Sequence, residues 1–129
     1  MTSYLDASAF VKLVVDEPES VAVYGFLERR PSIASSALTR AEAVRAVRHK
    51  GPDALLRVRE TLLAIDLVPV DDEIVDAAAL LDPRIARTLD AIHLATAIAM
   101  GDDLDVVVTY DKRMLEAAAL LGLPTTSPT

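Results

Sequence analysis

The stretch TLDAIHLATAIA, from Thr88 to Ala99, predicts a helix at the centre of the fold. Its residues are small and apolar on almost every side, as in a helix that is buried on most faces. The first turn nevertheless contains an acid, Asp90, and His93 lies one turn further on the same side. Asp90 has two interpretations: it caps free backbone N–H groups of the first turn, or it belongs to a metal or proton site in a cleft. The choice depends on the other acids of the chain.

Residues 105–109, DVVVT, form the clearest predicted strand, a β-branched run typical of the centre of a parallel sheet. Shorter strands are predicted at 3–5, 32–35 and 67–70, with a last edge strand or tail at 123–125. The segments between them have helical spacing, at about 7–15, 18–30, 37–50, 53–63, 71–81 and 114–121. Asp53 and Asp71 are expected as N-caps. Strands that alternate with helices predict an α/β fold of three layers, α/β/α, with a central, mostly parallel sheet. The 129 residues are expected to form a single domain.

The composition restricts the chemistry open to the protein. There is no cysteine, so disulfides and thiolate metal sites are excluded, and a metal would be bound by oxygen or by His49 and His93. No uncharged apolar run reaches the ~18 residues that span a bilayer, and the N-terminus lacks a basic and apolar leader. We therefore expect a cytoplasmic protein with no membrane segment. At a net charge of −7, nucleic acid would have to be met by local cations and metal ions rather than by bulk charge.

Four acids are expected at one edge of the predicted sheet. Asp6 directly follows the first strand and Asp111 follows the strand at 105–109, and the carboxyl ends of parallel strands share an edge. Asp90 and Glu42 lie near the starts of helices that run antiparallel to the strands, so they reach the same edge. Two like charges ~4 Å apart cost ~1 kcal/mol even in water, so such a cluster binds protons or a cation. Oxygen ligands without cysteine favour Mg²⁺ or Mn²⁺, ions that support phosphodiester hydrolysis.

Each of these residues also has a purely structural interpretation. Asp6 can end a strand in a turn, Asp111 can cap the next helix, and Glu42 can pair with Arg45 three residues on. His93 is interpreted as a buried histidine that supports the site rather than a metal ligand. The hydroxyls of Ser8 and Thr109 suit caps or strand ends better than nucleophiles. No Ser-His-Asp signature and no glycine-rich phosphate loop is present.

Four motifs taken together resemble the PIN-domain family, and most closely VapC-type toxins, the ribonuclease half of a bacterial toxin–antitoxin pair. They are YLDASA at 4–9, TRAE at 39–42, LDAIHLATA at 89–97 and TYDKRM at 109–114. The resemblance runs nearly end to end and implies metal ligands at Asp6, Glu42, Asp90 and Asp111. It also places Ser8 and Thr109 at the small hydroxyl positions that support the site. The implied activity is cleavage of single-stranded RNA that depends on Mg²⁺ or Mn²⁺.

A cationic stretch offers a route for RNA to this acidic edge. Residues 40–59 contain six cations and two acids, a local balance of +4 in an acidic chain. A stripe of this kind steers a phosphate backbone, or it is simply a solvated helix face. The candidate residues for RNA steering are Arg40, Arg45, Arg48 and Lys112.

Large apolar residues exceed what one inward face needs in the first two predicted helices, at 10–26. An exposed groove there would suit an amphipathic partner. The resemblance implies a cognate antitoxin whose segment lies in such a groove, and a homodimer.

Two other functions are compatible with strand-end acids. One is a receiver-like or flavodoxin-like module that binds Mg²⁺ for phospho-transfer, although Asp6 lacks the acidic neighbour that such a site needs. The other keeps the PIN-like fold but acts without catalysis, through protein partners.

Overall fold

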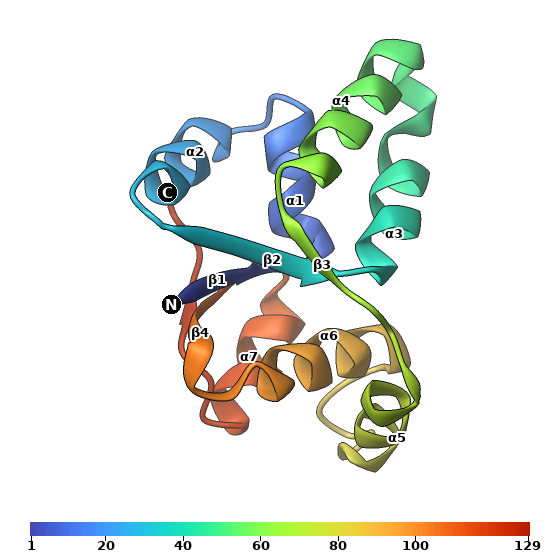
Figure 1. Cartoon of the computed structure of the whole chain (residues 1–129), viewed down its shortest axis with the longest axis vertical. Helices are drawn as coiled ribbons and strands as arrows, with labels where there is room; N and C mark the ends of the chain where they lie inside the picture. Colours follow the sequence, from blue (N-terminus) through green and yellow to red (C-terminus); the bar gives the residue numbers. More distant parts are fainter.

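A fully parallel sheet of five strands forms the middle layer of the protein (Figure 1). The structure is a computed structural model that describes residues 1–129. The strand order is β3-β2-β1-β4-β5, and each pairing is parallel. The strands are β1 (Thr2–Leu5), β2 (Ser32–Ser36), β3 (Asp66–Val68), β4 (Leu104–Val108) and β5 (Thr125–Thr126). The predicted three-layer α/β/α fold is therefore confirmed.

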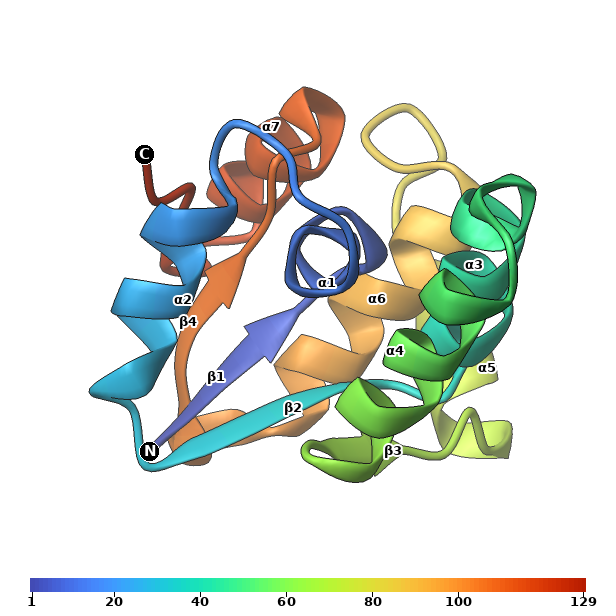
Figure 2. The ribbon, with the colours of Figure 1, turned by 90° about the horizontal axis from the view of Figure 1, so that it is seen from above.

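Helices cover both faces of this sheet, with α1 to α4 on one side and α5 to α7 on the other (Figure 1). Seen from above, α1 lies between α2 and the α3–α4 pair (Figure 2). The helices are α1 (Ala7–Val14), α2 (Ser20–Glu28), α3 (Leu38–Val47), α4 (Pro52–Leu63), α5 (Asp72–Leu80), α6 (Thr88–Ala99) and α7 (Lys112–Leu120). None of them is long and apolar enough to cross a membrane.

Two helix boundaries differ from the predicted ones, because the residues between α3 and α4 cap the helices in another way than expected. Asp53 does not cap α4: Gly51 is the N-cap, with a positive φ of 95°, and Pro52 fills the first helical position. The helix predicted to reach residue 50 ends at Val47 and tightens into a 3₁₀ turn before that glycine. By contrast, Asp71 caps α5 as expected, since its side chain accepts a hydrogen bond from the Ile74 N–H.

The strand order decides against a receiver-like or flavodoxin-like module. Those folds place the first strand between the second and the third, in the order 2-1-3-4-5. Here β1 lies between β2 and β4, and the order reverses between β1 and β4. Ligands of open parallel sheets bind at such a reversal, beyond the carboxyl ends of the strands. A ligand site is therefore expected at the residues that follow β1 and β4.

The predicted central helix is α6, and it is buried as expected. Residues 93–97 are all buried, and Ala91 and Ala95 pack against Ile74 and Ala78 of α5. On its other sides, α6 contacts α7 and the sheet. Small side chains let these helices approach closely, so α6 holds a fixed position under β1 and β4.

Candidate active site

Asp6 lies at the carboxyl end of β1 and is 3% exposed. Its Oδ1 accepts hydrogen bonds from the Ser8 hydroxyl at 2.6 Å and from the Ala9 N–H at 3.0 Å, so it is the N-cap of α1. Its Oδ2 accepts a hydrogen bond from the Thr109 hydroxyl at 2.5 Å. The structural alternative for Asp6 was a turn at the end of a strand, and the structure gives it the more specific role of N-cap, which is compatible with a second role. The carboxylate is fixed at the reversal of strand order, between β1 and β4.

Burial raises the pKa of Asp6 above its ordinary value, although the hydrogen bonds from Ser8, Thr109 and Ala9 oppose this shift. The direction shows that the cost of removing the carboxylate from water exceeds what these three donors return. A cation beside the carboxylate would offset that cost. Asp6 is therefore the residue at which the structure most clearly favours a bound positive charge.

Thr109 and Ser8 connect Asp6 to the end of β4. The Ser8 oxygen accepts a hydrogen bond from the Tyr110 N–H at 2.8 Å, and the Thr109 oxygen accepts one from the Asp111 N–H at 3.1 Å. Asp111 itself caps α7, because its Oδ1 accepts a hydrogen bond from the Arg113 N–H at 2.9 Å. The two predicted supporting hydroxyls thus lie between the two acids that follow β1 and β4.

Glu42 does not form the predicted alternative pair with Arg45. Its Oε1 lies 2.6 Å from Nε2 of His93, which is 3% exposed, and Nδ1 of His93 lies 2.7 Å from the Tyr4 hydroxyl. His93 therefore has a partner on both ring nitrogens and lies behind Glu42. Glu42 pairs with His93, 51 residues away, rather than with Arg45 at i+3. His93 is buried and held in place, whereas Arg45 is exposed to water, where an ion pair contributes little.

Asp90 occupies the third position of α6, one turn before His93. The N-cap of α6 is Arg87, and no side chain caps this helix. Asp90 is half-buried and makes no capping hydrogen bond, so the structure does not support its interpretation as a cap. Asp90 still lies in the first turn, at the positive end of the helix dipole.

Asp6 and Asp111 lie at the carboxyl ends of β1 and β4, but the structure does not gather the four predicted acids at a single point. No three acidic or histidine side chains lie close enough together to bind one ion directly. The donor set nevertheless fits Mg²⁺, which usually keeps several waters and is bound by one or two carboxylates. Asp6 and Asp111 each retain unshared oxygen lone pairs beside their capping bonds, and Asp90 is free of capping duty.

The four cations predicted to steer RNA are all exposed, and none of them forms a salt bridge. Two of them, Arg40 and Arg45, line a groove of about 580 Å³ between α3 and α4, together with Arg59. Arg40 precedes Glu42 by two residues, and positions i and i+2 of a helix do not face each other, so Arg40 and Glu42 point to different sides of α3. Lys112 lies apart from it, at the start of α7.

One residue of this region was not identified from the sequence. Tyr4 lies in the middle of β1 and is fully buried, with its hydroxyl on His93. A signal existed: side chains alternate along a strand, so Tyr4 must face opposite to Leu5, toward the layer that contains α6. A buried phenol needs a hydrogen-bond partner there, and His93 is a polar residue on that apolar helix.

Comparison with known proteins identifies the family of the chain. The model of the PIN domain matches residues 3–120. The chain is 50% identical to Ribonuclease VapC46 of Mycobacterium tuberculosis, over 97% of this chain and 96% of that protein. Two solved structures share the fold: VapC20 of Mycobacterium tuberculosis, described as a sarcin-ricin-loop-cleaving toxin, and a toxin–antitoxin complex from Klebsiella pneumoniae. VapC20 has a TM-score of 0.78 at 16% identity, and the match covers 98% of this chain and 99% of that chain. The Klebsiella pneumoniae complex has a TM-score of 0.76 at 21% identity, and the match covers 98% of each chain. On this evidence the chain belongs to the PIN-domain family.

Proposed function

We propose that the protein is a metal-dependent endoribonuclease that cleaves single-stranded RNA, the toxin of a type II toxin–antitoxin pair. The observation that carries the proposal is the buried Asp6, fixed at the reversal of strand order by Ser8, Ala9 and Thr109. The similarity of the whole chain to Ribonuclease VapC46, over 97% of its length, supports ribonuclease activity. The strand order removes the receiver-like alternative.

The chain's own residues position the reaction. Asp6 and Asp111 are held by capping bonds at two helix starts, so neither carboxylate has to be ordered when substrate arrives. We propose that Asp90 of α6 and Glu42 of α3 complete the site, and we expect some of the four acids to act through water. Mg²⁺ or Mn²⁺, when bound, would supply charge stabilisation and Lewis acidity at the scissile phosphate.

The charge of Asp111 can be tested apart from its role as a cap. Asparagine caps helices as well as aspartate, whereas alanine loses about 0.5–2 kcal/mol of stability. Asp111→Asn is therefore expected to keep the thermal stability of the parent and to lose cleavage by roughly 10- to 100-fold, whereas Asp111→Ala loses both. The assay is cleavage of a labelled single-stranded RNA after chelation and after Mn²⁺ is returned. Full activity of Asp111→Asn would remove this residue from the site, and activity of the parent under chelation would reject metal dependence.

The groove between α3 and α4 is proposed as the path of the RNA backbone. Three arginines without acidic partners line it, although the chain has a net charge of −7. Cations left unpaired in this way gain most from phosphate, because binding releases counterions rather than breaking salt bridges. The few aromatic residues, 4% of the chain, leave little base stacking to contribute.

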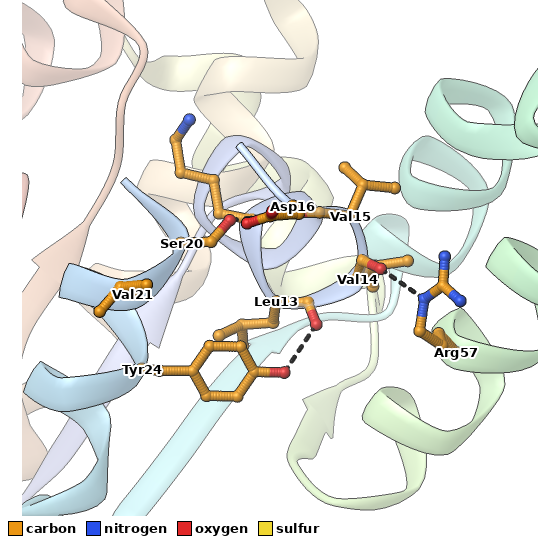
Figure 3. A pocket seen from close by; sticks show the side chains of 9 residues that line it. Leu13, Val14, Val15, Asp16, Ser20, Val21, Tyr24 and Arg57 are labelled. Carbon is orange, nitrogen blue, oxygen red and sulfur yellow. Dashed lines mark hydrogen bonds between the residues drawn. The ribbon is translucent and has the colours of Figure 1, made fainter. Parts of the chain in front are cut away.

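A second hollow is proposed to receive the antitoxin. It lies between α1, α2 and α4 and measures about 400 Å³ (Figure 3). Tyr24 and Leu13 line it, with the Tyr24 hydroxyl donating to the Leu13 carbonyl, and Arg57 donates to the Val14 carbonyl on the far side (Figure 3). Val21 at its rim is 82% exposed, so a bound partner would cover it. An apolar hollow with a cation at one end suits an amphipathic helix that carries an acid.

Val21→Glu is expected to weaken antitoxin binding by on the order of 10-fold or more, because it places an unpaired charge in the interface. The matched control is Leu120→Glu on α7, which replaces a similarly exposed apolar residue on the opposite face. Binding of the purified antitoxin, measured by calorimetry, checks the result, and RNA cleavage by the free toxin should not change in either variant. Equal losses of antitoxin affinity in the two variants would show that the antitoxin does not dock in this hollow.

A homodimer is also proposed, on the family resemblance. Exposed apolar side chains on the other face of the sheet would be covered in it, namely Val75, Leu80 and Leu89 of α5 and α6. Val75 also lines an apolar hollow of about 250 Å³ between these two helices.

A further inference from the structure

Three side chains form a hydrogen-bonded chain that crosses the protein from β1 to α6 to α3. The Tyr4 hydroxyl lies 2.7 Å from Nδ1 of His93, and Nε2 of His93 lies 2.6 Å from Oε1 of Glu42. Tyr4 and His93 are buried, while the Glu42 side chain is 25% exposed. The rings of Tyr4 and His93 also meet edge to face, with their centroids 5.9 Å apart. The chain thus runs from the core to the acidic edge.

The donors and acceptors of this chain have one consistent arrangement when the imidazole is neutral. The Glu42 carboxylate can only accept, so Nε2 of His93 must carry the proton. Nδ1 is then an acceptor, and the Tyr4 hydroxyl must donate to it. A phenol hydroxyl has one proton to donate, so it can supply this bond. Tyr4 therefore selects the tautomer of His93 that can donate to Glu42.

We propose that Tyr4 and His93 are positioning residues for Glu42: they fix one carboxylate oxygen so that the other is presented to the metal ion. This inference rests on the proposed function, because it gives Glu42 a metal to bind. In other metal sites, residues that hydrogen-bond to a metal ligand hold that ligand in its orientation. His93 and Tyr4 would do the same for the Glu42 carboxylate.

Burial cost indicates that these polar groups are not there for packing alone. A phenol and an imidazole placed between a strand and a helix require partners, whereas apolar side chains of similar shape require none. Tyr4 packs with Ala97, Leu104 and Val107, a setting that phenylalanine would fill equally well. The hydroxyl therefore contributes through His93 rather than through its contact with the core.

The tautomer can be read without metal or substrate. The chain has two histidines, and His49 is exposed, so the ring nitrogens of His93 can be assigned by ¹⁵N NMR of the metal-free protein. At a pH where the ring is neutral, we expect the proton on Nε2 in the parent, and loss of this preference in Tyr4→Phe. A neutral ring with its proton on Nδ1 in the parent would overturn the inference whatever the activity of the protein.

Metal binding gives the second readout. Tyr4→Phe is expected to lower Mn²⁺ affinity, measured by calorimetry, and kcat for RNA cleavage by roughly 10-fold each, with KM for RNA unchanged. His93→Gln, which keeps a donor toward Glu42, should retain more affinity than His93→Leu. The control is Thr2→Val, which removes a buried hydroxyl that bonds Ser32 and Asp103 at the opposite end of β1. It should cost thermal stability while leaving Mn²⁺ affinity and kcat at the parent level.

Glu42→Gln separates this inference from the proposed function. If Glu42→Gln loses Mn²⁺ affinity and cleavage while Tyr4→Phe matches the parent in both, the inference is wrong and the function stands. If Glu42→Gln itself binds Mn²⁺ and cleaves RNA as the parent does, the place of Glu42 in the proposed site is wrong. An equal loss of affinity in Thr2→Val and Tyr4→Phe would assign the effect to general destabilisation and also overturn the inference.

Discussion

Asp6→Asn is expected to abolish metal-dependent RNA cleavage, with a loss on the order of 100-fold or more, while the protein stays folded. Asn keeps an oxygen that can accept from Ser8 and the Ala9 N–H, so the N-cap of α1 survives. What is lost is the charge at the reversal of strand order. Cleavage of labelled RNA in Mn²⁺ measures the effect.

Asp71→Asn is the matched control for this variant. Asp71 caps α5 in the same way, through its side chain and the Ile74 N–H, but lies away from the acidic edge. It should cleave RNA as the parent does. Comparable loss in both variants would show that the amide at a cap, and not the missing charge, reduces activity.

Stability should respond to Asp6→Asn in the opposite direction. Burial raises the folded-state pKa of Asp6, so the folded protein binds the proton more tightly than the unfolded chain. The stability of the metal-free parent therefore falls as the pH rises from the unfolded pKa, near 3.8, through the higher folded pKa. Asn removes that fall, so the variant should melt a few degrees above the parent at neutral pH and show no such gain at the acidic end.

Added Mn²⁺ should reverse this order, because binding to the folded state raises the melting temperature of the parent alone. Thermal melts with and without Mn²⁺, at neutral and acidic pH, check both statements. A metal-free variant that melts below the parent at neutral pH would mean that the ionised carboxylate stabilises the fold, contrary to the direction of its pKa shift.

Sequence reasoning was successful where one periodicity determines the outcome. The small apolar pattern of α6 and the β-branched run of β4 fixed their burial, and the rule that parallel strands share an edge brought Asp6 and Asp111 together. The four motifs that suggested a PIN domain lie within the matched residues 3–120. These inferences depend on local spacing and on topology, which leave few alternatives.

Long-range side-chain pairing could not be predicted in the same way. Glu42 had a plausible neighbour in Arg45, and only the three-dimensional structure reveals that His93 of α6 is its partner. Asp53 resembled an N-cap, but Gly51 and Pro52 start the helix two residues earlier. In both cases several residues satisfied the local rule, and burial in three dimensions chose among them.

Phe10→Ala is expected to have the largest effect on stability, a loss of about 3–5 kcal/mol. Phe10 is fully buried where α1 packs on α3 and α4, in a cluster with Val14, Val47 and Val58. A cavity there is costly because helices from three segments cannot close on it without moving. Since a domain has only ~5–15 kcal/mol of stability, the variant should unfold at much lower urea concentration.

The chain provides its own control, because it contains two phenylalanines. Phe26 of α2 is half-buried and stacks under Arg30, so Phe26→Ala should cost clearly less in the same urea titration. Phe10 also affects the positions of two of the acids. Asp6 is the N-cap of α1 and α3 carries Glu42, and the cluster around Phe10 fixes these two helices against each other. Phe10→Ala should therefore also weaken Mn²⁺ binding at temperatures where the variant is still folded, whereas Phe26→Ala should not. Equal costs in urea, or unchanged Mn²⁺ affinity in folded Phe10→Ala, would show that the two helices are held in place by something other than this cluster.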